Sequence, residues 1–209
     1  MRHLLLYVAA MLILTGCNQT DRWDRTMDKA DSLMEKNQDS ASVSIKILDG
    51  IKPRLNEMTD KQKMKFRLLY AKAMNKGYIS FTSDSTMKEV TAYYDHHGSD
   101  NDKLMAHYLL GCVYRDMGDA PSAINCFNDA TEYADKDKNS YLMLCCIHGQ
   151  IADLLSGQTL VKENLRELGL AAHYAWLAGD TIDAITAYNQ KAFAYEVIGK
   201  TELAAKIHS

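Results

Sequence analysis

The chain has 209 residues, of which 47% are apolar and 24% charged, with two prolines and a formal net charge of -3. This composition is that of a folded protein with enough apolar material for one core or for a repeat array. A slightly acidic balance without a long basic run argues against a nucleic-acid-binding protein, which normally carries a basic face.

The first residues have the pattern of an export signal. Arg2 and His3 precede an apolar run of 11 residues, 4–14, which is about half the length needed to span a bilayer. A positive flank before a short apolar run is typical of a secretory signal peptide. The sequence Leu14-Thr15-Gly16-Cys17 that follows resembles the lipobox of bacterial lipoproteins. The alternative is an ordinary signal peptide with a chance cysteine.

The lipobox resemblance implies removal of residues 1–16 and lipid attachment to Cys17, which becomes the first residue of the mature chain. Residues 17–22 then form a polar tether ahead of the folded part. By resemblance to lipoprotein sorting, Asn18 in place of aspartate favours the outer membrane. We therefore expect a lipid-anchored protein of the bacterial cell envelope, at the periplasmic face or the cell surface.

Four further cysteines remain, and none has a CxxC or zinc-type spacing. They are Cys112, Cys126, Cys145 and Cys146. Cys112 and Cys126 fall inside helical patterns, where we expect buried, unreactive thiols. A bridge between the adjacent Cys145 and Cys146 would be strained within a helix, so we do not predict one.

From residue 23 onward, apolar residues recur at helical spacing. A first helix pair is expected in 23–55, where Pro53 ends the second helix. A second pair is expected in 64–97, and we interpret the polar residues 96–102 as a linker. We find no stretch that alternates apolar and polar residues over the length of a strand. The predicted fold class is therefore all-α.

The clearest helix pair lies in 104–137. Its first helix carries Leu110-Gly111 and then Tyr114, a turn follows at 118–121, and its second helix carries Ala123, Phe127 and Ala130. The small residues allow close helix approach, and the large ones fill the space between the helices. The pattern resembles the tetratricopeptide repeat (TPR), with its L-G-x2-Y and A-x3-F clusters.

Weaker copies of these clusters place repeat starts near residues 64, 104, 145 and 185. The expected repeats are 23–55, 64–97, 104–137, 145–177 and 185–209, all within one domain, 23–209. The last is expected to be incomplete, because only about nine residues remain for its second helix and no capping helix follows. The TPR resemblance implies a right-handed solenoid of stacked antiparallel helix pairs.

The sequence offers no catalytic constellation. Zincin, nucleophile-elbow and P-loop motifs are missing, and the acidic residues are scattered over helix surfaces. We interpret His96 and His97 as solvated residues, and His107 and His148 as packing residues at equivalent repeat positions. The prediction is a protein that is not an enzyme and that holds no metal or cofactor.

In TPR proteins the first helix of each pair lines a concave groove that holds a peptide or a partner's helix. By this resemblance, the residues at fixed distances after each repeat start are expected to line such a groove. The principal candidates are Lys65, Lys72, Asn75, Lys76, Tyr108, Arg115 and Asn189, and the same register selects Leu68, Met105, Cys112, Asp116, Gly149, Asp153, Ser156, Thr186, Phe193 and Glu196.

Cations, amides and an aromatic side chain together suit an acidic peptide or a C-terminal carboxylate. The alternative is a solvated face without a ligand. The residue set of the family's two-carboxylate clamp is not reproduced in successive repeats, so that ligand is not carried over.

The predicted function is that of a membrane-anchored lipoprotein that binds a protein or peptide partner, of unknown identity, through TPR-like repeats. Nucleic acid is not expected as a partner. An alternative is the truncated sensory region of a longer TPR signalling protein. A third possibility, a hydrolase within a helical solenoid, is disfavoured because no nucleophile and base can be paired.

Overall fold

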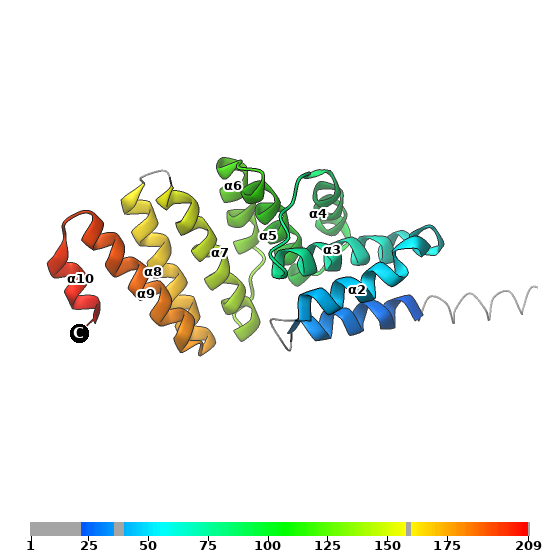
Figure 1. Cartoon of the computed structure of the whole chain (residues 1–209), viewed down its shortest axis with the longest axis horizontal. Helices are drawn as coiled ribbons and strands as arrows, with labels where there is room; N and C mark the ends of the chain where they lie inside the picture. Colours follow the sequence, from blue (N-terminus) through cyan, green and yellow to red (C-terminus); the bar gives the residue numbers. More distant parts are fainter. Residues whose placement is uncertain (1–21, 36–39, 158–159, 209) are drawn as a thin grey trace, which may run out of the picture. The chain divides into compact units, whose positions relative to one another are not determined.

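The structure is a computed structural model that describes residues 22–35, 40–157 and 160–208. Every regular element in these ranges is helical (Figure 1). The expected signal peptide, the expected lipidation site Cys17 and residues 17–21 of the expected tether lie outside the described residues, and Arg22 is already helical. Contacts divide the chain into two units, 1–80 and 81–209.

The fully described elements of the first unit are three α-helices and a 3-10 helix of six residues. They are a helix at residues 22–35, α2 (Ala41–Ile51), η2 (Lys52–Glu57) and α3 (Asp60–Lys76). Their buried faces share one apolar core that includes Trp23, Met27, Leu48, Phe66 and Leu69. In the same unit the buried hydroxyl of Ser44 donates to the carbonyl of Ala30 at 2.9 Å.

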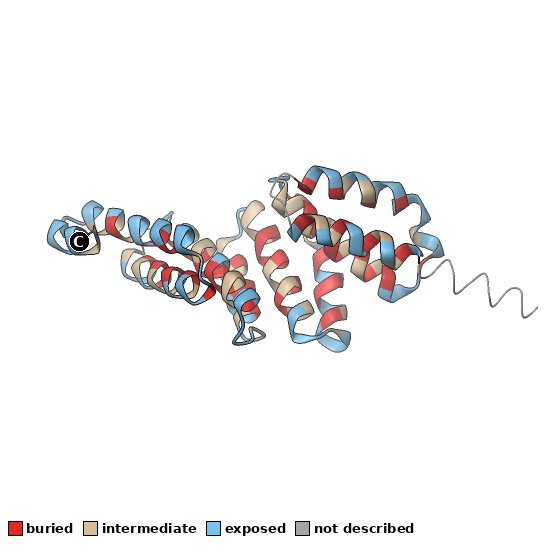
Figure 2. Cartoon of the chain, turned by 90° about the horizontal axis from the view of Figure 1, so that it is seen from below, coloured by how far each residue is buried: buried red, intermediate tan, exposed pale blue. Residues whose placement is uncertain are grey.

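The described residues of the second unit form seven successive helices. They are α4 (Ser85–His97), α5 (Asp100–Asp116), α6 (Ala120–Thr131), α7 (Lys138–Ser156), α8 (Val161–Ala178), α9 (Thr181–Val197) and α10 (Thr201–His208). Each helix packs chiefly on its neighbours in sequence. Buried positions lie on the helix faces turned toward these neighbours, and exposed positions lie opposite them (Figure 2).

Five of the described helices begin at a side chain that accepts a hydrogen bond from an otherwise unpaired backbone N–H group. Thr59 with Gln62 and Ser99 with Asp102 form reciprocal capping boxes. Single aspartate caps begin three more helices: Asp119 for α6, Asp137 for α7 and Asp180 for α9.

Three helices end in the same kind of turn, built on a left-handed glycine. Gly118 has a φ of 79°, and Gly179 and Gly199 each have a φ of 74°. In all three, the residue after the glycine donates its N–H to the carbonyl five residues earlier. Glycine adopts this conformation without the steric cost that a Cβ would add.

The turn expected at 118–121 lies at 117–119, because Asp119 caps α6 and Ala120 and Pro121 already belong to its first turn. Residues 96–102, interpreted as a linker, are mostly helical instead. The helix α4 continues through His97 and α5 begins at Asp100, because the Ser99 capping box starts a new helix immediately.

Close approach of α5 and α6 depends on Gly111. A Cβ built on Gly111 would lie 2.5 Å from Cε1 and 2.6 Å from Cδ1 of Phe127, whose side chain is fully buried. The rings of Tyr108 and Phe127 lie beside this contact, with centroids 5.8 Å apart. The small and large residues of the repeat pattern therefore play the parts that the sequence predicted.

Farther along, small residues line the contacts among α7, α8 and α9. Ala171, Ala172 and Ala187 form one buried cluster, and Cys145, Ala175 and Ala184 form another. Cysteine acts here as a small apolar residue.

The four described cysteines are free thiols. Cys112 and Cys126 are buried as predicted, and burial raises the pKa of Cys112 to about 12 and that of Cys126 to about 11. Cys146 is exposed and forms no bridge with Cys145.

Replacing Gly111 with alanine is expected to lower the free energy of unfolding by about 1–3 kcal/mol, because the added methyl group overlaps the Phe127 ring in a packed core. Gly149→Ala is the matched control, since Gly149 is also helical but has no atom within 4 Å of its Cβ position. That variant should gain about 0.5–1 kcal/mol from helix propensity. Urea titration measures both, and equal effects would contradict the close-approach argument.

Candidate functional site

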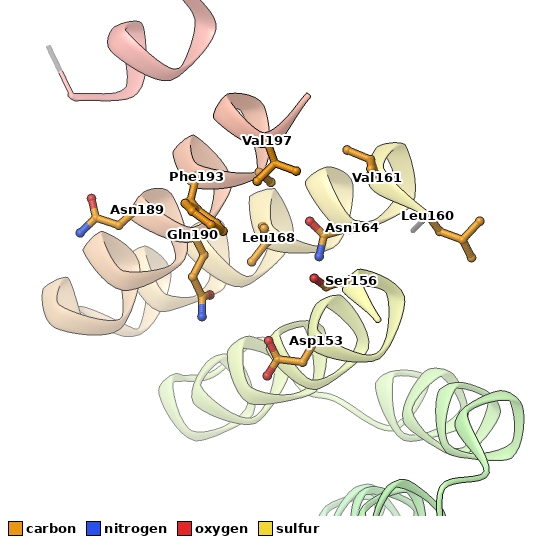
Figure 3. A pocket seen from close by; sticks show the side chains of 11 residues that line it. Asp153, Ser156, Leu160, Val161, Asn164, Leu168, Asn189, Gln190, Phe193 and Val197 are labelled. Carbon is orange, nitrogen blue, oxygen red and sulfur yellow. The ribbon is translucent and has the colours of Figure 1, made fainter. Parts of the chain in front are cut away.

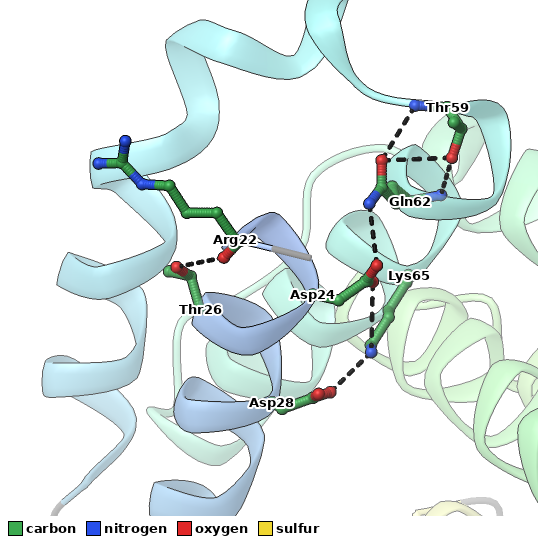
Figure 4. A network of polar contacts seen from close by, with 7 residues as sticks. All are labelled: Arg22, Asp24, Thr26, Asp28, Thr59, Gln62 and Lys65. Atoms are coloured by element: carbon green, nitrogen blue, oxygen red, sulfur yellow. Dashed lines mark hydrogen bonds and ion pairs between the residues drawn. The ribbon is translucent and has the colours of Figure 1, made fainter. Parts of the chain in front are cut away.

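Two of the three candidate lysines of α3, Lys65 and Lys72, are paired with carboxylates of their own unit. Nζ of Lys65 lies 2.6 Å from Oδ1 of Asp28 and 3.7 Å from Oδ1 of Asp24 (Figure 4). The capping residue Gln62 donates to the other oxygen of Asp24 at 2.9 Å. Nζ of Lys72 lies 2.6 Å from Oδ1 of Asp31. These ion pairs join α3 to the helix at 22–35 and occupy two of the positive charges that were predicted to meet a ligand.

The remaining α3 candidates lie at the end of the helix. Asn75 and Lys76 are half-buried in its last turn, and the carbonyl of Asn75 accepts from the N–H of Tyr78 at 3.2 Å. Leu68, which the same register selected, is buried with 6% exposure and belongs to the core.

On α5, Arg115 is engaged by groups of the protein. Nη2 of Arg115 lies 2.7 Å from Oδ1 of Asp116, and Nη1 donates to Oε1 of Gln150 on α7 at 2.5 Å. Asp116 also accepts from the N–H of Phe81 at 3.0 Å. Arg115 thus ties α5 to α7. Its neighbour Cys112 is fully buried, so it does not face a groove as the register predicted.

Asn189, the last principal candidate, lines a groove of about 510 Å³ formed by α7, α8, α9 and the turn before α8. We call this the α7–α9 groove (Figure 3). Its lining residues are Asp153, Ser156, Leu160, Val161, Asn164, Leu168, Asn189, Gln190, Phe193, Ala194 and Val197. The residues from α8 that lie deepest are Asn164 and Leu168, both buried.

Four positions chosen by the repeat register line this groove together: Asp153 and Ser156 of α7, and Asn189 and Phe193 of α9. These four residues come from two helices, α7 and α9, that the repeat register treats as equivalent. Sequence reasoning missed the α8 residues at the floor. Asn164 and Leu168 belong to a second helix, to which the family pattern assigns no groove role.

The walls of the groove expose large apolar side chains. Phe193 is 66% exposed, Val197 is 67% exposed and Leu160 is 42% exposed. Aromatic and aliphatic side chains that are held on rigid helices beside a concavity are the usual anchors of a binding site. The polar groups among them come from two amides of α9, Asn189 and Gln190, and from Ser156 and Asp153 of α7.

A buried polar network holds α8 against α7 behind this groove. The Asn164 amide donates to the carbonyl of Ala152 at 2.7 Å. The His148 imidazole donates from Nδ1 to Oε2 of Glu167 at 2.6 Å, and Arg166 donates to Oε1 of the same carboxylate at 2.6 Å. The ring of Tyr174 stacks on His148 with an interplanar angle of 5°.

The network determines the charge state of Glu167. Burial by itself would raise the pKa of Glu167, but the hydrogen bonds and charges of His148 and Arg166 outweigh it and hold that pKa below its ordinary value. His148, interpreted from the sequence as a packing residue, therefore packs and also donates a hydrogen bond to the buried carboxylate of Glu167.

The described ranges contain no group of three or more His, Cys, Asp or Glu side chains placed to hold a metal ion. His96 and His97 are exposed at the end of α4. Among the described helices, none combines the length and apolar character that a membrane crossing requires.

Comparison with solved structures fits this architecture. Two crystal structures of nearly identical TPR-like repeats, from a Podosopora anserina protein described as a kinesin light chain, superimpose with TM-scores of 0.64 and 0.63. Each is 12% identical in sequence, and each match covers 90% of this chain and 92% of the other. The chain has a TPR-like repeat fold. No protein-family model and no curated protein matches the sequence.

Stability should depend on the charge of Glu167. A carboxyl whose pKa is lowered by folding stabilises the protein above its unfolded-state value, 4.5, and that contribution is lost as the pH falls through the folded-state pKa. We expect Glu167→Gln to be less stable than the parent at neutral pH and to lose less stability on acidification. Unfolding titrations at several pH values measure both effects. Glu163→Gln, at an exposed position of α8, is the control, and its free energy of unfolding should depend on pH as that of the parent does.

Proposed function

We propose that this protein is a non-enzymatic scaffold that binds a segment of a partner protein in the α7–α9 groove. The observation that carries the proposal is the exposure of Phe193 and Val197 at the wall of a concavity of about 510 Å³. Apolar side chains exposed around a concavity mark binding surfaces, because a partner that covers them removes apolar area from water.

The scaffold character follows from how the groove is built. Its walls are on α7 and α9, each held by hydrogen-bonded caps at Asp137 and Asp180 and by packing against α8. Rigid helices present their side chains at fixed spacing, which lowers the entropy cost of binding. TPR-like repeats generally mediate protein interactions, which supports this function.

The proposed ligand differs from the acidic peptide expected from the sequence. Lys65 and Lys72 are paired with aspartates, and Arg115 is held by Asp116 and Gln150. An acidic ligand would have to displace these partners, and the gain from exchanging one carboxylate for another is small. We therefore place the binding function in the largely apolar α7–α9 groove.

We also propose that the scaffold is a lipoprotein anchored at the bacterial outer membrane through Cys17. The support is the sequence alone: a short apolar run that ends in Leu14-Thr15-Gly16-Cys17, with Asn18 next. A diacylated cysteine gives stable attachment, whereas a single acyl chain gives marginal, reversible binding.

Groove binding predicts a position-specific loss of affinity. Peptides selected from a random display library on the full chain should bind Phe193→Ala about thirtyfold more weakly, since removing an anchor aromatic costs about 2 kcal/mol. Ile182→Ala is the matched control, because Ile182 lies on the same helix and is 76% exposed but does not line the groove. Fluorescence anisotropy measures both. Equal losses, or failure to select any peptide, would refute the site.

If the protein is anchored through a lipid on Cys17, replacing Cys17 should block processing of the signal peptide. Cys17→Ala should stay unprocessed and incorporate no radiolabelled palmitate when the full gene is expressed in a bacterial host, because the modified thiol is missing. Cys146→Ala removes an exposed thiol elsewhere and should label like the parent. Membrane fractionation then reports which membrane holds the labelled protein. Normal processing of the Cys17 variant would rule out the anchor.

A further inference from the structure

The α7–α9 groove contains a single kind of charge. Among the described residues that line it, Asp153 is the one ionisable side chain, and the other polar groups are two asparagines, a glutamine and a serine. Amide and hydroxyl groups both accept and donate hydrogen bonds, so they do not select for the sign of a ligand's charge. The electrostatic preference of the groove therefore comes from one carboxylate.

The carboxylate of Asp153 is available to a ligand. Its side chain is accessible to solvent and makes no hydrogen bond or ion pair with a described residue. Arg115 is the cation whose charge it feels, but the guanidinium of Arg115 is held by Asp116 and Gln150. Asp153 thus differs from Asp24, Asp28 and Asp31, whose carboxylates already have partners.

Protein atoms around Asp153 partly desolvate its carboxylate, although the side chain remains accessible to solvent. Desolvation by nearby protein atoms raises its pKa above the ordinary value, although the charge of Arg115 acts in the opposite direction. A charge in such surroundings interacts more strongly with an incoming cation than one in bulk water does.

Apolar side chains face Asp153 from the other wall. Figure 3 shows Asp153 on α7 and Phe193 and Gln190 on α9, with Leu168 of α8 between them. Lysine and arginine side chains lay their apolar stems along such surfaces while the charged end reaches a polar partner. The face of an aromatic ring such as Phe193 also attracts a cation.

We infer that the α7–α9 groove selects a partner segment in which a lysine or arginine lies beside apolar side chains, with its cation on Asp153 and its stem against Phe193 and Leu168. This inference rests on the proposed function, for which it names the ligand chemistry. An acidic segment would bring a second carboxylate against Asp153, so the same residue that attracts one class of partner excludes the other.

The test uses peptides selected from a random library on the full chain. The selected sequences should be enriched in lysine or arginine next to apolar residues. Asp153→Asn, which keeps the shape and removes the charge, should bind a selected peptide about tenfold more weakly. The same peptide with its cation replaced by norleucine should bind the parent and Asp153→Asn equally. Asp183→Asn, an exposed carboxylate on α9 outside the groove, is the control and should match the parent.

Each other outcome overturns the inference in a recognisable way. Peptides that need Phe193 but carry no cation, or whose affinity is unchanged by Asp153→Asn, would leave the binding scaffold in place and remove the charge selectivity. Selection of acidic peptides would contradict it directly. Concentration-dependent dimerisation that Asp153→Asn abolishes would identify a second copy of this chain as the occupant instead.

Discussion

Close approach of helices through small side chains is the interaction on which this structure depends. Gly111 brings α5 against Phe127 of α6, and alanines occupy the contacts among α7, α8 and α9. Small residues let the backbones approach and leave the larger side chains to fill the space on either side. Where α7, α8 and α9 pack in this way, their outer faces form the groove.

Much of the fold could be predicted from the sequence because its determinants are local. The turn after Gly118, the Gly111–Phe127 contact and the burial of Cys112 and Cys126 all follow from spacing within a helix pair. The break between α4 and α5 was misread because a polar segment can be a linker or two helix ends that meet, and only the Ser99 capping box distinguishes them.

The candidate site was harder to predict for the opposite reason. Whether Lys65 and Lys72 are available depends on aspartates 37 and 41 residues away in sequence, and no periodic pattern reveals those pairings. Asp153, Ser156, Asn189 and Phe193, which the repeat register selects, line one groove. The repeat register could not show that Asp153 has no partner among the described residues, which is what we infer sets the charge preference of the groove.

The groove walls belong to α7 and α9, which are separated by α8. Its width is therefore set by the packing angles at two helix interfaces, α7 with α8 and α8 with α9. The α7–α8 interface is held by the hydrogen bonds of Asn164 and Glu167, whereas small residues form the buried clusters that α8 shares with α9. A segment that fills the groove contacts all three helices and so fixes both angles. Occupancy of the groove and the local curvature of this helix stack are therefore coupled.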